Sequence, residues 1–209
     1  MQSRILAAAI ALAAPFAARA ETGAEIGLRT GFAVPFGKID GTASGSLSDL
    51  FTGFIPIGID LGWRFTPNFS AGLAGKYAFG ITTNCPSGDR CSGHDVSLGL
   101  ELRYHVQPDQ RFDPWVGIGA GYEWLSVSET SGGNTVNVGA DGFEFVHAQV
   151  GADFTVSNNV RIGPFVQLTL GQYKSENASV NGGPTRFVDV TNKALHEFLT
   201  FGVRVIFLP

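Results

Sequence analysis

The sequence predicts an all-β fold: an eight-stranded antiparallel transmembrane up-and-down β-barrel. Three observations predict it. Large apolar residues alternate with small or polar residues in eight segments, the connections between these segments are alternately long and short, and the charged residues of each segment share one face. Alternation with a period of two indicates a β-strand with two different faces. A barrel strand in a bilayer needs an apolar face toward lipid and a polar face toward the interior.

The segment 199–207 shows the alternation most clearly. Leucine, phenylalanine or valine occupies every second position, and Thr200, Gly202 and Arg204 lie between them. Ile206 interrupts the polar face. The apolar face carries no charge and ends in Phe207, an aromatic residue of the kind that lies at the membrane interface. We therefore interpret this segment as a membrane-spanning strand.

Seven earlier segments repeat this pattern: residues 24–34, 52–64, 69–79, 96–105, 116–124, 146–155 and 160–171. Their predicted outward faces carry no charge, and a Lys or Arg exposed to lipid near mid-membrane would cost about 2–4 kcal/mol. The predicted inward faces of all eight segments hold acids and bases in nearly equal number: Glu25, Arg29, Asp60, Arg64, Lys76, Glu101, Arg103, Glu123, Asp153, Arg161 and Arg204. We expect a paired charge network in the lumen, because an unpaired buried charge is costly.

The connections also favour a membrane barrel. Long polar connections follow the first, third, fifth and seventh strands; they include residues 37–49, 126–141 and 174–193, which we expect to be loops. Short connections at 66–68, 107–113 and 157–159 follow the second, fourth and sixth strands. This order indicates long external loops and short periplasmic turns, and it requires an even number of strands. The alternative is a soluble barrel, whose charged face would meet water and would seldom be so rich in glycine.

The first twenty residues predict a signal peptide. Arg4 is followed by an apolar run over 5–14, and Ala18-Arg19-Ala20 matches a cleavage site. A membrane anchor is the alternative, but the run is too short to span a bilayer. We expect residues 1–20 to be removed and residues 21–209 to form one barrel domain.

Composition and cysteine content limit the partners and sites. Only 15% of residues are charged, the net charge is −4, and no basic run exists, so we expect no nucleic-acid partner. Cys85 and Cys91 are close together, and in an exported chain such a pair indicates a local disulfide. His94 lies nearby, but two cysteines and one histidine at this spacing match no zinc pattern. We therefore expect neither a metal nor a cofactor.

Aromatic residues near the strand ends predict two interfacial girdles. The periplasmic girdle is expected to hold Trp63, Phe65, Phe69, Tyr104, Phe112, Trp115, Phe154 and Phe207. The external girdle is expected to hold Phe51, Phe79, Trp124, Phe145, Tyr173 and Phe198. The alternative for any one of these residues is an ordinary core position.

These features together resemble the small bacterial outer-membrane barrels related to OmpA, OmpX, OmpW and the opacity proteins. The resemblance covers residues 21–209 and rests on architecture, because no family-specific motif can be transferred residue by residue. It implies an integral outer-membrane protein that contacts outer-membrane lipid and lipopolysaccharide. It also implies insertion by the barrel-assembly machinery, for which the aromatic-ended last strand would be the signal.

Three functions are open within this class. The first is a non-enzymatic barrel with a structural or surface-interaction role through external loops, whose partner the sequence does not name. The second is a narrow OmpW-like channel for small or apolar solutes, suggested by inward-facing glycines: Gly58, Gly62, Gly117, Gly119 and Gly121. The third is a lipid-modifying enzyme, for which His94, His147 and His196 are candidates; none lies in a catalytic motif, so we assign no catalytic residue. Because eight strands enclose an interior just wide enough for side chains, the first is favoured.

Overall fold

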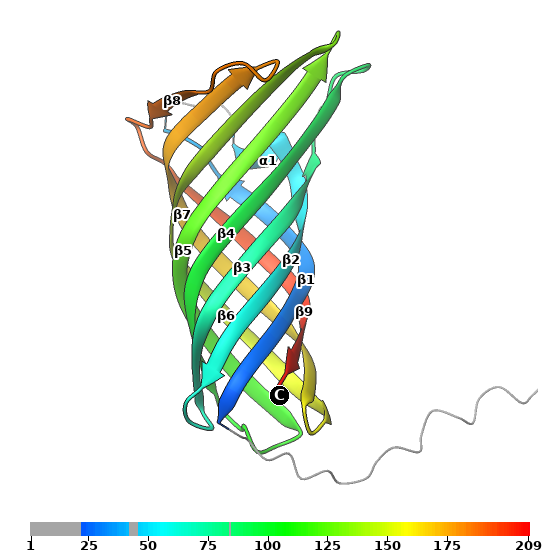
Figure 1. Ribbon diagram of the computed structural model, residues 1–209, viewed down its shortest axis with the longest axis vertical. Helices are drawn as coiled ribbons and strands as arrows, with labels where there is room; N and C mark the ends of the chain where they lie inside the picture. The colour runs from blue at the N-terminus through cyan, green and yellow to red at the C-terminus, as the bar shows by residue number, and fades with distance from the viewer. Residues whose placement is uncertain (1–21, 42–45, 84) are drawn as a thin grey trace, which may run out of the picture.

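The computed structural model describes residues 22–41, 46–83 and 85–209, and in this part of the chain eight long strands form a closed antiparallel barrel (Figure 1). The barrel strands are β1 (Gly23–Gly37), β2 (Phe51–Arg64), β3 (Phe69–Thr82), β4 (Arg90–His105), β5 (Phe112–Ser131), β6 (Asn134–Ser157), β7 (Val160–Val180) and β9 (Leu195–Phe207). The signal peptide predicted for 1–20 lies outside the described residues. Among those described, no helix has both the length and the apolar character needed to cross a bilayer.

Pairing between the first and last strands closes the ring. β1 pairs with β2 on one side and with β9 on the other, from Ile26 opposite Phe207 to Val34 opposite Leu199. β9 then pairs with β7, and β7 with β6. Closure satisfies the backbone hydrogen bonds that an open sheet would leave unpaired in lipid. The predicted topology of eight antiparallel strands is confirmed.

The two faces of the sheet have opposite character. Leu100 on β4 is 67% exposed on the outer surface, whereas its neighbour Glu101 is 6% exposed and points into the lumen. An open apolar groove of about 960 Å³ crosses the outer face near Leu61, Ala71 and Leu100. Most of its lining is apolar and belongs to the lipid-facing surface.

The external connections differ from the prediction. Residues 126–141, expected to be a loop, continue β5 and β6 into a long hairpin whose turn is Gly132-Gly133. Both glycines have positive φ, 54° and 85°, which a two-residue hairpin turn of this kind requires. Figure 1 shows this hairpin projecting beyond the rest of the barrel. Within 174–193, β7 likewise continues to Val180, and the short strand β8 (Arg186–Asp189) pairs along it.

The helix α1 (Leu47–Leu50) lies in the connection between β1 and β2. Its start is fixed by a capping box, in which the backbone N–H of Ser46 donates to Asp49 Oδ2 at 2.6 Å. Leu47 is fully buried, and Phe51 follows at the start of β2. Thr52 has the same phase as Asp60 and Arg64, so the alternation predicts an inward position for it. This prediction is wrong, because a bulge between Phe51 and Gly53 leaves Thr52 exposed.

Four aromatic residues assigned to the girdles lie inside the barrel. Phe51, Tyr173 and Phe198 are buried at the external end, and Trp115 is buried near the periplasmic end. Phe145 does face outward, as expected, because a bulge between Glu144 and Val146 reverses the alternation of β6. The other residues assigned to the girdles, such as Trp63 and Phe79, are exposed on the outer face.

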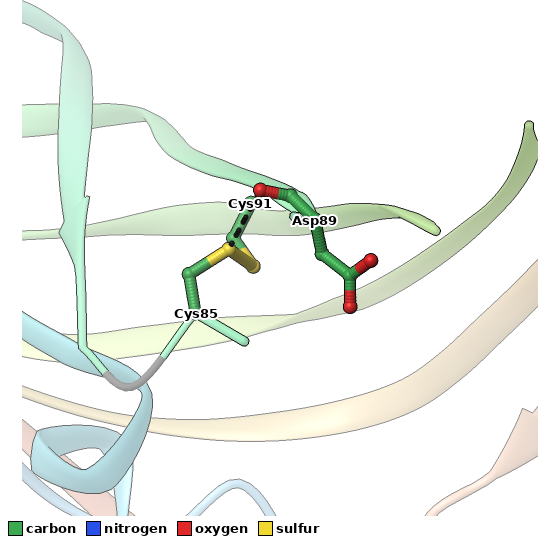
Figure 2. The surroundings of a disulfide bond; sticks show 3 residues. All are labelled: Cys85, Asp89 and Cys91. Carbon is green, nitrogen blue, oxygen red and sulfur yellow. Dashed lines mark hydrogen bonds between the residues drawn. A yellow bond between two sulfur atoms is a disulfide. The ribbon is translucent and has the colours of Figure 1, made fainter. Parts of the chain in front are cut away.

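The predicted disulfide is confirmed. Cys85, in the external connection between β3 and β4, is bonded to Cys91, near the start of β4 (Figure 2). Gly88 adopts a φ of +97° in the turn between them, where nothing lies within 4 Å of the position that a Cβ would occupy. The disulfide thus closes a short external loop and crosses no part of the barrel wall.

Candidate functional site in the barrel lumen

The periplasmic third of the lumen contains ion pairs that link distant strands. Arg204 on β9 binds Asp153 on β6 in a bidentate pair, with N–O distances of 2.9 and 2.5 Å. Trp115 on β5 completes this cluster: its Nε1–H donates to Asp153 at 3.2 Å, and its ring lies 3.7 Å from the Arg204 guanidinium carbon. Charge, hydrogen bonding and cation–π attraction therefore hold three strands together.

A second cluster closes the same end of the barrel. Arg161 Nη1 donates to Asp113 Oδ2 at 2.9 Å, and His105 Nδ1 lies 2.7 Å from that same oxygen. Arg64 Nη2 lies 2.5 Å from Glu25 and 3.2 Å from His105 Nε2. All five side chains are buried, and they join strands on opposite sides of the barrel. Paired charges of this kind avoid the cost of a lone buried charge.

The middle of the lumen holds a network of charged side chains. Asp60 accepts from Arg29 at 2.8 Å and from Arg103 at 2.7 Å. Arg103 also contacts Glu101, which accepts a hydrogen bond from Gln149 at 2.7 Å. The network joins β1, β2, β4 and β6 across the lumen.

Toward the external end the pairs involve lysine and histidine. Lys76 Nζ lies 2.7 Å from Asp95, His196 Nε2 lies 3.0 Å from Glu123, and His147 contacts Glu144. The ring of His196 stacks on Tyr173, with 4.0 Å between their centroids.

An aromatic plug lies beyond these pairs. We define it by its four rings and one aliphatic side chain, all buried: Phe51, Phe54, Tyr173, Phe198 and Leu47. Phe54 packs against Phe51 at a centroid distance of 4.5 Å and against Phe198 at 5.6 Å. Lys76 Nζ lies 5.2 Å from the Phe198 ring, which connects the plug to the charges below.

Between the plug and the middle network, the lumen retains a small cavity of about 30 Å³. Its wall includes Lys76, Ser97, Glu144 and His147. This volume has room for about one water molecule. The lumen is therefore packed by side chains from its periplasmic end to the plug.

Comparison with known proteins identifies the architecture. Residues 4–163 match the family model described as an outer membrane protein beta-barrel domain. The chain belongs to this outer-membrane β-barrel family. A relative named "Outer membrane protein" from Gluconacetobacter diazotrophicus is 32% identical over 157 residues, which are 68% of this chain and 39% of the relative. The chain thus spans about two fifths of that relative's length.

Solved structures share the fold of this outer-membrane barrel. Neisserial surface protein A has a TM-score of 0.50 and 17% identity, with 88% of this chain and 96% of that chain covered. A major outer membrane protein from Thermus thermophilus has a TM-score of 0.52 and 12% identity, with 88% and 99% covered. At these identities the likeness concerns the fold alone. The family and the fold place the protein in the outer membrane of a Gram-negative bacterium, as predicted.

The predicted lumen residues of the outer-membrane barrel all point inward. Each has an ionic partner: Glu25 with Arg64, Arg29 and Arg103 with Asp60, Arg103 with Glu101, Lys76 with Asp95, Glu123 with His196, Asp153 with Arg204, and Arg161 with Asp113. Sequence reasoning missed three acids, Asp95, Asp113 and Glu144. Asp95 and Asp113 have the inward phase of β4 and β5 and lie just before the segments assigned to those strands. Glu144 could not be found by phase, because the bulge beside it shifts the alternation.

The histidines are distributed over two faces. His147 and His196 are buried in the lumen, whereas His94 points outward and stacks on Tyr77 at 5.4 Å. His94 is therefore not brought together with the other two candidates for catalysis.

Among the residues that the structure describes, one group of side chains has donor atoms close enough to suit a metal ion. Ligand atoms of His105, Asp113 and Asp153 lie within 4.8 Å of one another. Arg161 and Arg204 already neutralise the two carboxylates, and a cation placed among them would meet like charge. These residues fit an ion-pair cluster better than a metal centre.

Proposed function

We propose that this outer-membrane barrel is a non-enzymatic protein that does not conduct solutes and acts through its external ends. The observation that carries this proposal is the filled lumen. Three layers of buried ion pairs are followed by the aromatic plug, and the cavity between them is about 30 Å³. A pore for even a small solute needs a continuous path, and this lumen has side chains across that path at every level described above.

Opening such a path would be costly. A solute would have to separate Arg204 from Asp153 and Arg103 from Asp60, which are buried pairs on different strands. Breaking one buried pair by removing a partner typically costs about 3–5 kcal/mol. The solute would also have to separate Phe54 from Phe198, whose rings pack against each other. The ion pairs and the plug therefore favour a closed barrel.

Gly117 and Gly119 are two of the inward glycines that favour the channel alternative in the sequence, and neither widens the lumen. A Cβ on Gly119 would lie 2.1 Å from His147 Nε2 and 2.3 Å from the Leu100 carbonyl oxygen. At Gly117 the nearest atom would be Arg103 Cγ, at 3.4 Å. Neighbouring side chains thus occupy the space that these glycines leave. The glycines serve packing within the wall and support the closed barrel.

The partners that this proposal implies lie on the outer and external surfaces. The outward face of Ile, Leu, Val and aromatic residues suits acyl chains, with lipopolysaccharide in the external leaflet. β9 ends in outward-facing Phe207, which is the signal that we propose the barrel-assembly machinery recognises. The external hairpin and loops would contact other molecules.

Planar-bilayer conductance of the refolded mature protein tests this function. We expect a flat current trace at voltages that resolve single openings of a general porin added as a positive control. The barrel of the same refolded sample must resist proteolysis, so that an absence of current cannot be attributed to misfolding. Discrete conductance steps whose frequency rises with the amount of protein would overturn the proposal and favour the narrow channel.

A further inference from the structure

The charges of the lumen form three layers that differ in their bases. Among the described residues, three acids near the periplasm pair with three arginines, and two acids in the middle pair with two arginines. His105 lies beside the periplasmic pairs, but the arginines alone match the acids in number. Arginine stays charged in proteins. The third layer, which we call the external charge layer, consists of Lys76, Asp95, Glu123, Glu144, His147 and His196.

The external charge layer balances its charge through its two histidines. Its three carboxylates are at most 4% exposed, and they face one lysine, whose charge is fixed near neutral pH. Protonated His147 and His196 supply the two further positive charges that balance requires. Imidazole changes its charge between about pH 5 and 8. When both histidines are neutral, two buried negative charges remain without a cation, which is costly.

Each histidine contacts a carboxylate from another strand. His196 on β9 lies with its Nε2 3.0 Å from Glu123 Oε1 on β5. His147 on β6 contacts Glu144 of its own strand, and its Nε2 lies 3.6 Å from Glu101 Oε2 on β4. The other charged or titratable groups that face the two histidines come from β1, β3, β4 and β7: Arg29, Lys76, Asp95 and Tyr173.

The external charge layer is joined to the aromatic plug through His196. The imidazole stacks on Tyr173 with 4.0 Å between centroids, and it meets the Phe198 ring edge-on at 5.8 Å. Phe198 in turn packs against Phe54 at 5.6 Å. Two members of the plug therefore contact a side chain whose charge depends on pH.

We propose that the external charge layer is a pH-sensitive latch for the aromatic plug: protonated His147 and His196 hold the plug in place, and their deprotonation at alkaline pH loosens it. Deprotonation leaves Glu123 and Glu144 buried without their partners, so the strands that carry them, β5 and β6, no longer attract β9 as strongly. This inference deepens the proposed function, because it concerns the plug that closes the lumen. Bilayer conductance tests whether the lumen conducts, and the following experiment tests whether the plug moves, so the two can fail separately.

The test is NMR of the refolded barrel in lipid nanodiscs from pH 6 to pH 9, with carbon-13 in the phenylalanine and histidine rings. We expect the ring signals of Phe54 and Phe198 to shift with the same midpoint pH as those of His196. The signals of Phe54, one ring further from the histidine, report movement of the plug. His196→Gln should remove at least half of the pH-dependent shift of Phe54. His94→Gln is the matched control and should leave this shift unchanged, because His94 lies on the outer face.

A second measurement follows the stability of the barrel. The native layer binds the protonated histidines, so the urea midpoint should fall as the pH rises from 6 to 9. His147→Gln combined with His196→Gln should reduce this fall at least twofold, and His94→Gln should not change it.

Several results would overturn the proposal. Constant Phe54 signals while those of His196 titrate would mean that the layer changes charge without moving the plug. An equal pH response in wild type and His196→Gln would place the titrating group elsewhere, and loss of the response in His94→Gln would place it on the outer face. A urea midpoint that does not fall with pH would also contradict the latch. The comparison of midpoint pH values uses the wild-type protein, so it decides the question even if His196→Gln does not refold.

Discussion

Arg204 and Asp153 form a buried bidentate ion pair between β9 and β6, two strands separated by β7 in the barrel wall. Both side chains are 1% exposed. The pair therefore ties the closing strand to a strand that it does not adjoin in the wall, and Trp115 covers it. It is the clearest case of how inward charges hold this barrel together.

Removing one member of this pair should destabilise the barrel. Asp153→Asn leaves the Arg204 charge buried without its partner, so we expect a loss of about 3–5 kcal/mol in the free energy of unfolding. Arg204→Met should cost a similar amount. The double variant should recover part of the loss, since neither charge is then left alone. Urea unfolding from liposomes measures this, and strictly additive losses would contradict the pairing.

The aromatic plug should contribute to stability as a core does. Phe51→Ala removes a fully buried ring from the plug and should cost about 3–5 kcal/mol, because a cavity remains. Phe79→Ala is the control: Phe79 is exposed on the lipid-facing side, and acyl chains can fill the space that it leaves. Equal losses in the two variants would show that Phe51 is not enclosed.

Two inward glycines should respond differently to a methyl group. At Gly119 a Cβ would meet the Leu100 carbonyl oxygen at 2.3 Å, and backbone cannot move aside easily. At Gly62 the nearest atoms would be 3.5 Å away, an ordinary contact. Gly119→Ala should therefore destabilise the barrel by about 1–3 kcal/mol. Gly62→Ala should change the urea midpoint little, and a reversal of this order would refute the packing described here.

The strands and their faces were predictable because a bilayer enforces strict alternation. From Ile55 to Arg64 on β2, each apolar residue on one face meets lipid and each charge on the other meets the lumen. If this alternation is extended toward the ends of the strands, Trp115, Tyr173 and Phe198 fall on the inward face, because each lies an even number of residues from an inward-facing residue of its own strand. Proximity to a strand end was the misleading criterion, because it assigned them to girdles.

Other features depend on contacts that a single sequence does not reveal. The bulge at Glu144 reverses the phase of β6, so neither this acid nor Phe145 follows the simple alternation. The projecting hairpin was predicted as a loop because its composition is polar, although Val136 and Val138 alternate beside the Gly132-Gly133 turn. The ion-pair partners within the charge network could not be predicted, because they depend on the register between strands that are far apart in the chain.

The disulfide should matter little to the barrel itself. It joins residues six apart at the external end of β4, so its loss frees only a short loop. Cys85→Ser with Cys91→Ser should leave the urea midpoint nearly unchanged. In unreduced native protein neither cysteine should react with maleimide, while reductant should expose both. Labelling without reductant would contradict the bond, and a large loss of stability would contradict its peripheral role.

The account depends above all on which face meets lipid, and Leu100 and Glu101 test this most directly. They are adjacent on β4 and point to opposite sides. Glu101→Gln serves as the companion variant: it should still insert into liposomes, but with lower stability, because Arg103 loses a charged partner.

The decisive measurement is the urea midpoint of Leu100→Arg refolded into liposomes, with Leu100→Phe as the control for a change of shape without charge. If Leu100 faces lipid near mid-membrane, the arginine should lower the free energy of unfolding by about 2–4 kcal/mol, and the phenylalanine should be tolerated. An unchanged midpoint for Leu100→Arg would contradict the lipid-facing assignment, and with it the packed, charge-paired lumen.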